Sequence, residues 1–248
     1  MTLEQFFAEN REVAIAFSGG VDSAYLLYAA TRYAARVKAY YVSTAFQPAF
    51  ELEDARRLAD ELGADMLVLH VDVLSNSAVT ANPSDRCYHC KNTLFRQILR
   101  AAENDGFPVL LDGTNASDDA GDRPGMRALR VLSVRSPLRE CGLTKAEIRR
   151  LSRDAGLFTW DKPAYACLAT RIRTGEEITL QKLKQTEKAE GSLFGLGFRD
   201  FRVRMVGNTA KLELREANLP LLLENREKIV TELRKDYDSV MLNLEVRK

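Results

Sequence analysis

Short apolar runs alternate with amphipathic stretches from Glu12 to about Asp161. Four runs have the composition of buried strands, and they lie at 13–17, 37–42, 66–71 and 108–111. The stretches between them have helical periodicity, at 23–35, 51–62 and 89–103. Such alternation is typical of a parallel sheet that is covered by helices on both faces. Because these sheets bind ligands beyond the carboxyl ends of their strands, we expect a site in the loops that follow the runs.

The pattern changes after Gly175. A helical stretch at 180–194 precedes two alternating strands, at 201–206 and 210–214, which flank a turn at Gly207-Asn208. A helix at 219–235 and a strand at 240–246 follow. We therefore expect two domains, an α/β domain at 1–175 and a small α+β domain at 176–248.

Composition and charge narrow the class of protein. Of the 248 residues, 46% are hydrophobic and 29% are charged, as in soluble globular proteins. The 36 Lys and Arg nearly balance the 35 Asp and Glu, which argues against a nucleic-acid partner. No apolar run is long enough for a membrane span, and the first residues do not resemble a signal peptide. We expect a cytoplasmic protein whose four cysteines are reduced thiols.

The first predicted strand leads directly into the hexapeptide Ser18-Gly19-Gly20-Val21-Asp22-Ser23, which opens the first predicted helix. Two glycines allow the backbone to turn tightly and to approach an anion. The helix start adds N–H groups and the positive end of the dipole. Asp22 on its own would repel phosphate. We therefore expect it either to lie near a magnesium ion or to be a residue of the first helical turn. The ordinary phosphate-loop sequence, which ends in a lysine and a serine or threonine, is absent. The hexapeptide could be a glycine-rich turn without a ligand, but its place between a strand and a helix predicts a nucleotide site.

Cysteines form the second candidate site. Cys87 and Cys90 stand three residues apart at the start of a predicted helix, and such a pair can hold zinc, an iron–sulfur cluster or a redox disulfide. A third ligand must come from elsewhere. Cys167, near Arg171, is expected to be exposed and to favour the thiolate, whereas Cys141 is interpreted as a small buried apolar residue. Three thiolates would leave one iron of a four-iron cluster open to an outside sulfur.

The loop at Ser18–Ser23 resembles the pyrophosphate-binding loop of the PP-loop ATP pyrophosphatases, which cleave ATP to AMP and pyrophosphate while they adenylate a substrate. That resemblance implies a Rossmann-like fold of the adenine nucleotide alpha hydrolase-like type, with ATP and Mg²⁺. Other short motifs extend the resemblance over nearly the whole chain and identify it as similar to the LarE family. They are Gly113-Thr114-Asn115, Asp118-Asp119, Asp122-Arg123-Pro124-Gly125, Ser136-Pro137-Leu138, Trp160-Asp161-Lys162-Pro163, Ala166-Cys167-Leu168 and Arg202-Val203-Arg204.

LarE proteins are ATP-dependent sulfur transferases that help to build the nickel-pincer nucleotide cofactor of lactate racemase. The resemblance implies adenylation of a carboxylate on pyridinium bis-carboxylic acid mononucleotide, followed by sulfur insertion to give a thiocarboxylate. It implies a set of ATP-binding residues, with Asp22 near Mg²⁺: Ser18, Gly19, Gly20, Val21, Asp22, Ser23, Gly113, Thr114 and Asn115. It implies a second set around the substrate phosphate: Thr170, Arg171, Glu190, Arg202 and Arg204. We also expect a homo-oligomer assembled through the small domain, and other nickel-cofactor biosynthesis proteins as partners.

The source of the sulfur divides LarE proteins into two types. In one type a cysteine matching Cys167 surrenders its own sulfur and becomes dehydroalanine. In the other, cysteines matching Cys87, Cys90 and Cys167 bind a [4Fe-4S] cluster with an extra sulfide. Because this chain keeps the Cys-x-x-Cys pair, we expect the cluster type.

Two other functions stay open. A transfer-RNA thiolase of the same superfamily would act on a large polyanion, which a net charge of +1 does not favour. A nucleotide-binding protein stapled by zinc would use the same cysteines structurally, without catalysis.

Overall fold

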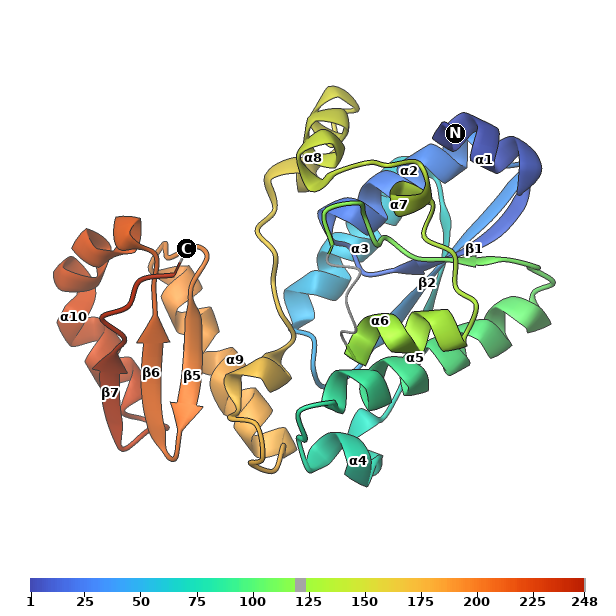
Figure 1. Cartoon of the computed structure of the whole chain (residues 1–248). Coiled ribbons are helices and arrows are strands. Elements are labelled where there is room, and N and C mark those ends of the chain that lie inside the picture. Colours follow the sequence, from blue (N-terminus) through green and yellow to red (C-terminus); the bar gives the residue numbers. More distant parts are fainter. Residues whose placement is uncertain (119–123, 248) are drawn as a thin grey trace. The chain divides into compact units, whose positions relative to one another are not determined.

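The computed structural model describes residues 1–118 and 124–247 (Figure 1). The motif residues Asp119, Asp122 and Arg123 lie outside the described residues. Contacts divide the chain into two compact units. The first unit comprises Met1–Val73 and Asp85–Lys162, and the second comprises Leu74–Ser84 and Pro163–Lys248.

The division differs from a single boundary at 175/176. The second unit includes residues 163–175 and also the short stretch Leu74–Ser84. Two backbone hydrogen bonds explain this, because Gly175 N donates to Asn82 O and Ile178 N donates to Thr80 O. Pairing between such distant segments leaves no pattern in the local sequence.

The first unit contains a four-stranded parallel sheet in the order β3-β2-β1-β4. The strands are β1 (Glu12–Phe17), β2 (Arg36–Ser43), β3 (Asp65–His70) and β4 (Leu110–Leu111). The predicted parallel sheet is confirmed, although β4 is shorter than the apolar run at 108–111. Pairing of Ile15 with Leu111 places β4 directly beside β1.

Helices cover both faces of this sheet, as expected (Figure 1). Val13 and Ile15 of β1 pack into a core with the residues of α1, α2 and α3, whereas Ala14 packs into a second core with Ile98 of α5. Successive β1 residues therefore face opposite cores, which is why the whole strand is apolar. The helices are α1 (Leu3–Glu9), α2 (Val21–Tyr33), α3 (Ala49–Leu62), α5 (Arg86–Asn104), α6 (Pro124–Val131), α7 (Pro137–Glu140) and α8 (Lys145–Asp154).

The second unit has the predicted order of helix, hairpin, helix and strand. Its elements are α4 (Ser77–Thr80), α9 (Leu180–Gly195), β5 (Arg202–Val206), β6 (Thr209–Glu213), α10 (Leu219–Leu233) and β7 (Ser239–Leu242). Strands β5 and β6 are antiparallel around the turn at Gly207, which has φ +56°, and β7 runs parallel to β6. The predicted last strand at 240–246 is too long, because β7 ends at Leu242.

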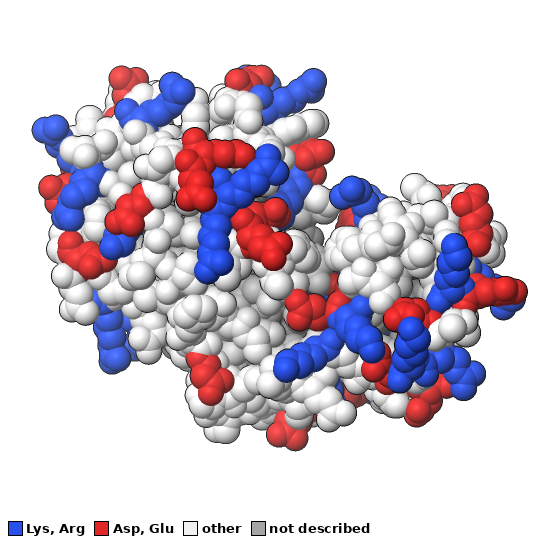
Figure 2. Space-filling view, turned by 180° about the vertical axis from the view of Figure 1, so that it is seen from behind, with Lys and Arg blue, Asp and Glu red and all other residues white. Residues whose placement is uncertain are grey.

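The distribution of charged side chains on the surface and the polarity of the helices both agree with the amino-acid composition. Figure 2 shows basic and acidic side chains interspersed over the face that is drawn, as the near-zero net charge leads one to expect. Within the described ranges, no helix is both long enough and apolar enough to cross a bilayer.

Candidate active site

A pocket of about 340 Å³ opens in the first unit, where the loops after β1 and β4 meet. It lies at the point where the strand order reverses between β1 and β4, which is where open α/β sheets bind ligands. Its lining comes from β1, these loops, α2 and α5: Ala16, Ser18, Gly20, Asp22, Ser23, Lys91, Phe95, Asp112, Gly113, Thr114 and Asp118.

The glycine-rich loop has the conformation that its sequence requires. Gly19 has φ +70°, and a Cβ on it would lie 3.2 Å from Cβ of Ala55 in α3. Ser23 Oγ donates to Gly20 O and lies 3.0 Å from Ser18 Oγ, which closes the loop on itself. Gly20 caps α2 without a side-chain hydrogen bond, so the first N–H groups of the helix are left for an anion.

Gly113 brings the second loop against the first. A Cβ on Gly113 would lie 2.9 Å from Ser23 N and 3.1 Å from Ser23 Cα, too close for any other residue. The close approach of these two backbones therefore depends on glycine at position 113.

Asp112, which the sequence analysis missed, anchors this second loop. Its carboxylate is buried, and it accepts hydrogen bonds from Thr114 Oγ1 at 2.5 Å and from Ser136 Oγ at 2.6 Å. Asp112 directly follows β4, so its position at a strand's carboxyl end could have signalled its role. Its hydroxyl partners orient the carboxylate toward the pocket that it lines.

The structure gathers six of the nine predicted ATP-binding residues around the pocket. These are Ser18, Gly20, Asp22, Ser23, Gly113 and Thr114. The other three shape the site from behind. Gly19 packs against α3, Val21 is buried in the core, and Asn115 is buried where its backbone N–H donates to Asp118 Oδ2. Their part in binding ATP stays a prediction.

Lysines near the loop are a further feature that the sequence analysis did not assign to this site. Lys145 Nζ lies 2.6 Å from Asp22 Oδ2, and Lys162 Nζ lies 2.6 Å from Asp54 Oδ2. Burial is the largest influence on Asp22 and raises the pKa of its carboxyl group, although the ion pair with Lys145 opposes the rise. A cation or a metal ion would therefore stabilise the ionised form of Asp22.

The cysteine pair lies where it was predicted, in the first turns of a helix. Cys87 and Cys90 belong to α5 of the first unit, and Cys87 is exposed while Cys90 is half-buried. Arg86 Nη2 lies 3.8 Å from Cys87 Sγ. Both thiols are accessible enough to act as ligands.

Cys167 of the second unit is half-buried at the start of the 3₁₀ turn Leu168–Arg171. The expectation that Cys167 lies in an exposed site beside Arg171 is not met, because Cys167 is half-buried and the Arg171 side chain is only 1% exposed. Glu190 of α9 holds Arg171 through Nε and Nη2, at 2.8 and 2.9 Å. Arg171 Nη1 donates to the backbone oxygen of Ala166 and to Thr170 Oγ1, so Arg171 contacts the chain before and after Cys167.

Arg202 and Arg204 project from the same face of β5, as predicted from their spacing. Arg204 donates to Glu213 and to Thr170 O. Within the described part of the chain Arg202 makes no ion pair; burial and the nearby cations Arg247, Arg171 and Arg204 lower its pKa. This concentration of guanidinium groups is suited to an anion.

The described residues contain no group of three or more His, Cys, Asp or Glu side chains that could hold a metal ion. The three predicted cluster ligands are divided between the units, with Cys87 and Cys90 in the first and Cys167 in the second. Cys141 is half-buried against the core of the first unit, and burial raises the pKa of its thiol.

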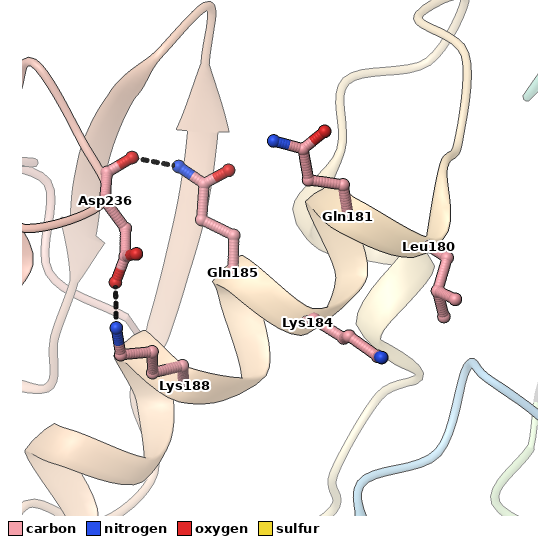
Figure 3. Close-up of a pocket in the computed structure, with 6 residues that line it drawn as sticks. All are labelled: Leu180, Gln181, Lys184, Gln185, Lys188 and Asp236. Atoms are coloured by element: carbon pink, nitrogen blue, oxygen red, sulfur yellow. Dashed lines mark hydrogen bonds and ion pairs between the residues drawn. The ribbon is translucent and has the colours of Figure 1, made fainter.

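A second pocket lies along α9, outside all the predicted sites (Figure 3). It is lined by Leu180, Gln181, Lys184, Gln185, Lys188 and Asp236. The Lys188 ammonium group lies 2.7 Å from the Asp236 carboxylate, and the Gln185 amide donates to Asp236 O. These contacts hold the segment after α10 against α9, which is a structural role.

Comparison with known proteins identifies the family. The asparagine synthase family model matches residues 4–118, a stretch that includes the glycine-rich loop. The chain is 40% identical to an uncharacterized protein of Synechocystis, over 86% of this chain and 80% of that protein. It is 32% identical to the pyridinium-3,5-bisthiocarboxylic acid mononucleotide synthase of Lactiplantibacillus plantarum, over 88% of this chain and 80% of that enzyme. The PP-loop geometry and this similarity along the chain show that the protein belongs to the LarE family.

Proposed function

We propose that this protein is an ATP-dependent sulfur transferase that converts a carboxylate of pyridinium bis-carboxylic acid mononucleotide into a thiocarboxylate. The observation that carries the proposal is the pocket between the PP-loop and Gly113, in a chain that is 32% identical to the bisthiocarboxylic acid mononucleotide synthase. The reaction belongs to the maturation of a nickel-pincer nucleotide cofactor.

The first step activates a carboxylate, which is a poor acyl donor. A carboxylate oxygen attacks the α-phosphorus of ATP, the bond to pyrophosphate breaks, and an acyl-adenylate forms. The N–H groups at the start of α2 and the hydroxyls of Ser18 and Ser23, which line the pocket, would stabilise the charge on the leaving pyrophosphate. Asp22 would hold Mg²⁺ there, and its buried oxygen Oδ1, which accepts no hydrogen bond from the described residues, fits that role.

The second step delivers sulfur. A sulfur nucleophile attacks the acyl carbon, AMP leaves with the carboxylate oxygen, and a thiocarboxylate remains. We propose that Cys87, Cys90 and Cys167 hold a [4Fe-4S] cluster, since all three thiols are at least partly exposed and thiolates are its usual ligands. When bound, such a cluster supplies an open iron position for an extra sulfide.

The second unit is proposed to hold the substrate phosphate. Arg202 and Arg204 lie on one face of β5, with Thr170 beside them. Arg171 and Glu190 form a buried ion pair, and we propose that this pair holds in position the segment from Cys167 to Thr170. Assembly into a homo-oligomer through this unit is part of the same proposal.

A turnover experiment under anaerobic conditions tests this function. We expect the protein with ATP, Mg²⁺ and the pyridinium substrate to release AMP and pyrophosphate and to replace a carboxylate oxygen by sulfur. The Cys167→Ser variant should make no thiocarboxylate, whereas Cys141→Ser should match the unchanged protein, because Cys141 packs against the core.

Mass spectrometry of the same samples separates the two sulfur sources. A native mass that includes four irons and four sulfides, with an intact polypeptide after turnover, supports the cluster. A polypeptide lighter by one hydrogen sulfide identifies Cys167 as a single-use donor and contradicts the cluster. Absence of thiocarboxylate in the unchanged protein contradicts the function itself.

A further inference from the structure

Lys145 contacts the PP-loop from a position 123 residues away along the chain. Its Nζ lies 2.6 Å from Asp22 Oδ2, while the other oxygen of that carboxylate is buried and accepts no hydrogen bond from the described residues. The lysine side chain is one-third exposed, so it can change partners. A flexible cation therefore lies in contact with the carboxylate of the nucleotide loop.

The backbone of Lys145 is fixed independently of Asp22. Lys145 is the first residue of α8, and Thr144 caps this helix in a reciprocal capping box with Glu147. Lys145 N also donates to Ser117 Oγ at 2.9 Å. A cation in the first turn opposes the helix dipole, so helix formation does not explain a lysine here. A lysine at position 145 is better explained by the contact of its ammonium group with the nucleotide loop.

The charge of the pocket indicates what that group is for. Among the described residues that line it, there are three carboxylates, those of Asp22, Asp112 and Asp118, and one cation, that of Lys91. ATP is a polyanion, and this loop lacks the lysine of the ordinary phosphate loop. Further positive charge is needed before phosphates can lie beside these carboxylates.

We propose that Lys145 is a phosphate-binding residue, which leaves Asp22 for a phosphate oxygen when ATP binds. This inference rests on the proposed ATP site. It assigns to Lys145 the charge stabilisation of the departing pyrophosphate, and it releases Asp22 Oδ2 at the moment when the nucleotide arrives.

Calorimetric binding of ATP, in EDTA and in Mg²⁺, tests the inference. We expect Lys145→Gln to weaken ATP binding by about tenfold to a hundredfold, as for a lost hydrogen bond between charged groups. Adenosine binding should not change, and Lys145→Arg should keep most of the ATP affinity. Arg150→Gln is the matched control, because Arg150 lies on the same helix in an exposed ion pair with Asp154 and should bind ATP normally.

A double variant separates binding of phosphate from orientation of Asp22. If Lys145 binds phosphate, adding Lys145→Gln to Asp22→Asn weakens ATP binding further. Equal ATP binding by Asp22→Asn and the double variant, or an equal loss of adenosine binding in Lys145→Gln, overturns the inference. ATP binding by the unchanged protein with no loss in Lys145→Gln overturns the role of Lys145 alone. If the unchanged protein binds no ATP, the proposed ATP site fails as well.

Discussion

At the scale of single residues, the nucleotide pocket depends on the distance between two backbone segments. The loop at Gly113 lies so close to the first turn of α2 that there is no room for a Cβ at position 113. The same turn supplies the N–H groups proposed to bind phosphate. A change at Gly113 would therefore act on both segments together.

We expect Gly113→Ala to weaken ATP binding and to lower the free energy of unfolding by about 1–3 kcal/mol, as other insertions into packed sites do. The added Cβ would lie 2.9 Å from Ser23 N, so one of the two loops must move. Titration with ATP and denaturant unfolding measure the two effects.

The matched control is Gly191→Ala in the interior of α9, where a Cβ would contact nothing within 4 Å. Alanine favours a helix over glycine by about 1 kcal/mol, so this variant should be more stable. Equal ATP binding and equal stability in Gly113→Ala and the unchanged protein would show that the two loops are not in tight contact.

Much of the pocket was predictable because its residues stand together in the sequence. The hexapeptide at Ser18–Ser23 carries a local signal of glycine and small polar residues, whereas Gly113 and Thr114 were expected from the resemblance to the LarE family. Lys145 carries none, since its contact with Asp22 joins positions far apart. The burial of Arg171 was not foreseen for the same reason, because its ion-pair partner Glu190 comes from another element.

At the scale of elements, a sequence motif at the start of helix α8 positions a residue of the site. The spacing Thr144-x-x-Glu147 forms a capping box, with both side-chain hydrogen bonds present. Because α8 begins at Lys145, the cap also fixes the backbone position from which the Lys145 side chain extends. Its amphipathic face packs Ile148 into the core of the first unit.

We expect Thr144→Ala to lower the free energy of unfolding by about 1 kcal/mol, the usual value of a helix cap. It should also weaken ATP binding, because the first turn of α8 carries Lys145. Thr2→Ala is the matched control, since Thr2 forms the same capping box at α1, outside the pocket. It should cost similar stability and leave ATP binding unchanged. A loss of ATP binding in both variants would mean that general destabilisation is the cause.

The long elements were predictable and the short ones were not. Strands β1, β2 and β3 and helices α2, α3 and α5 are long apolar or periodic segments. Helices α1, α6 and α7 were missed, because seven, eight and four residues give little periodicity. Strand β4 is two residues long because beyond Leu111 the chain turns into the site at Asp112.

At the scale of the whole molecule, the chain passes between the two compact units three times, after Val73, after Ser84 and after Lys162. The order of elements predicted two folding units but not the detour through Leu74–Ser84. That stretch is held in the second unit by Asn82, whose side chain is 1% exposed. Asn82 Nδ2 donates to Arg173 O at 2.8 Å and to Ile172 O at 3.4 Å.

We expect Asn82→Ala to loosen this stretch from the second unit without affecting the first. Asn82 has φ +53°, which alanine adopts at a cost of about 1–2 kcal/mol, and two carbonyl groups would lose their donor. Hydrogen exchange should accelerate at the amides of Gly175 and Ile178, which bind Asn82 O and Thr80 O. The amide of Ala14, bonded to Val109 O in the first unit, should exchange as before. Asn82→Gly, which tolerates this φ but lacks the amide, should accelerate exchange less. Uniform acceleration in both units would instead show that Asn82 stabilises the molecule as one cooperative whole.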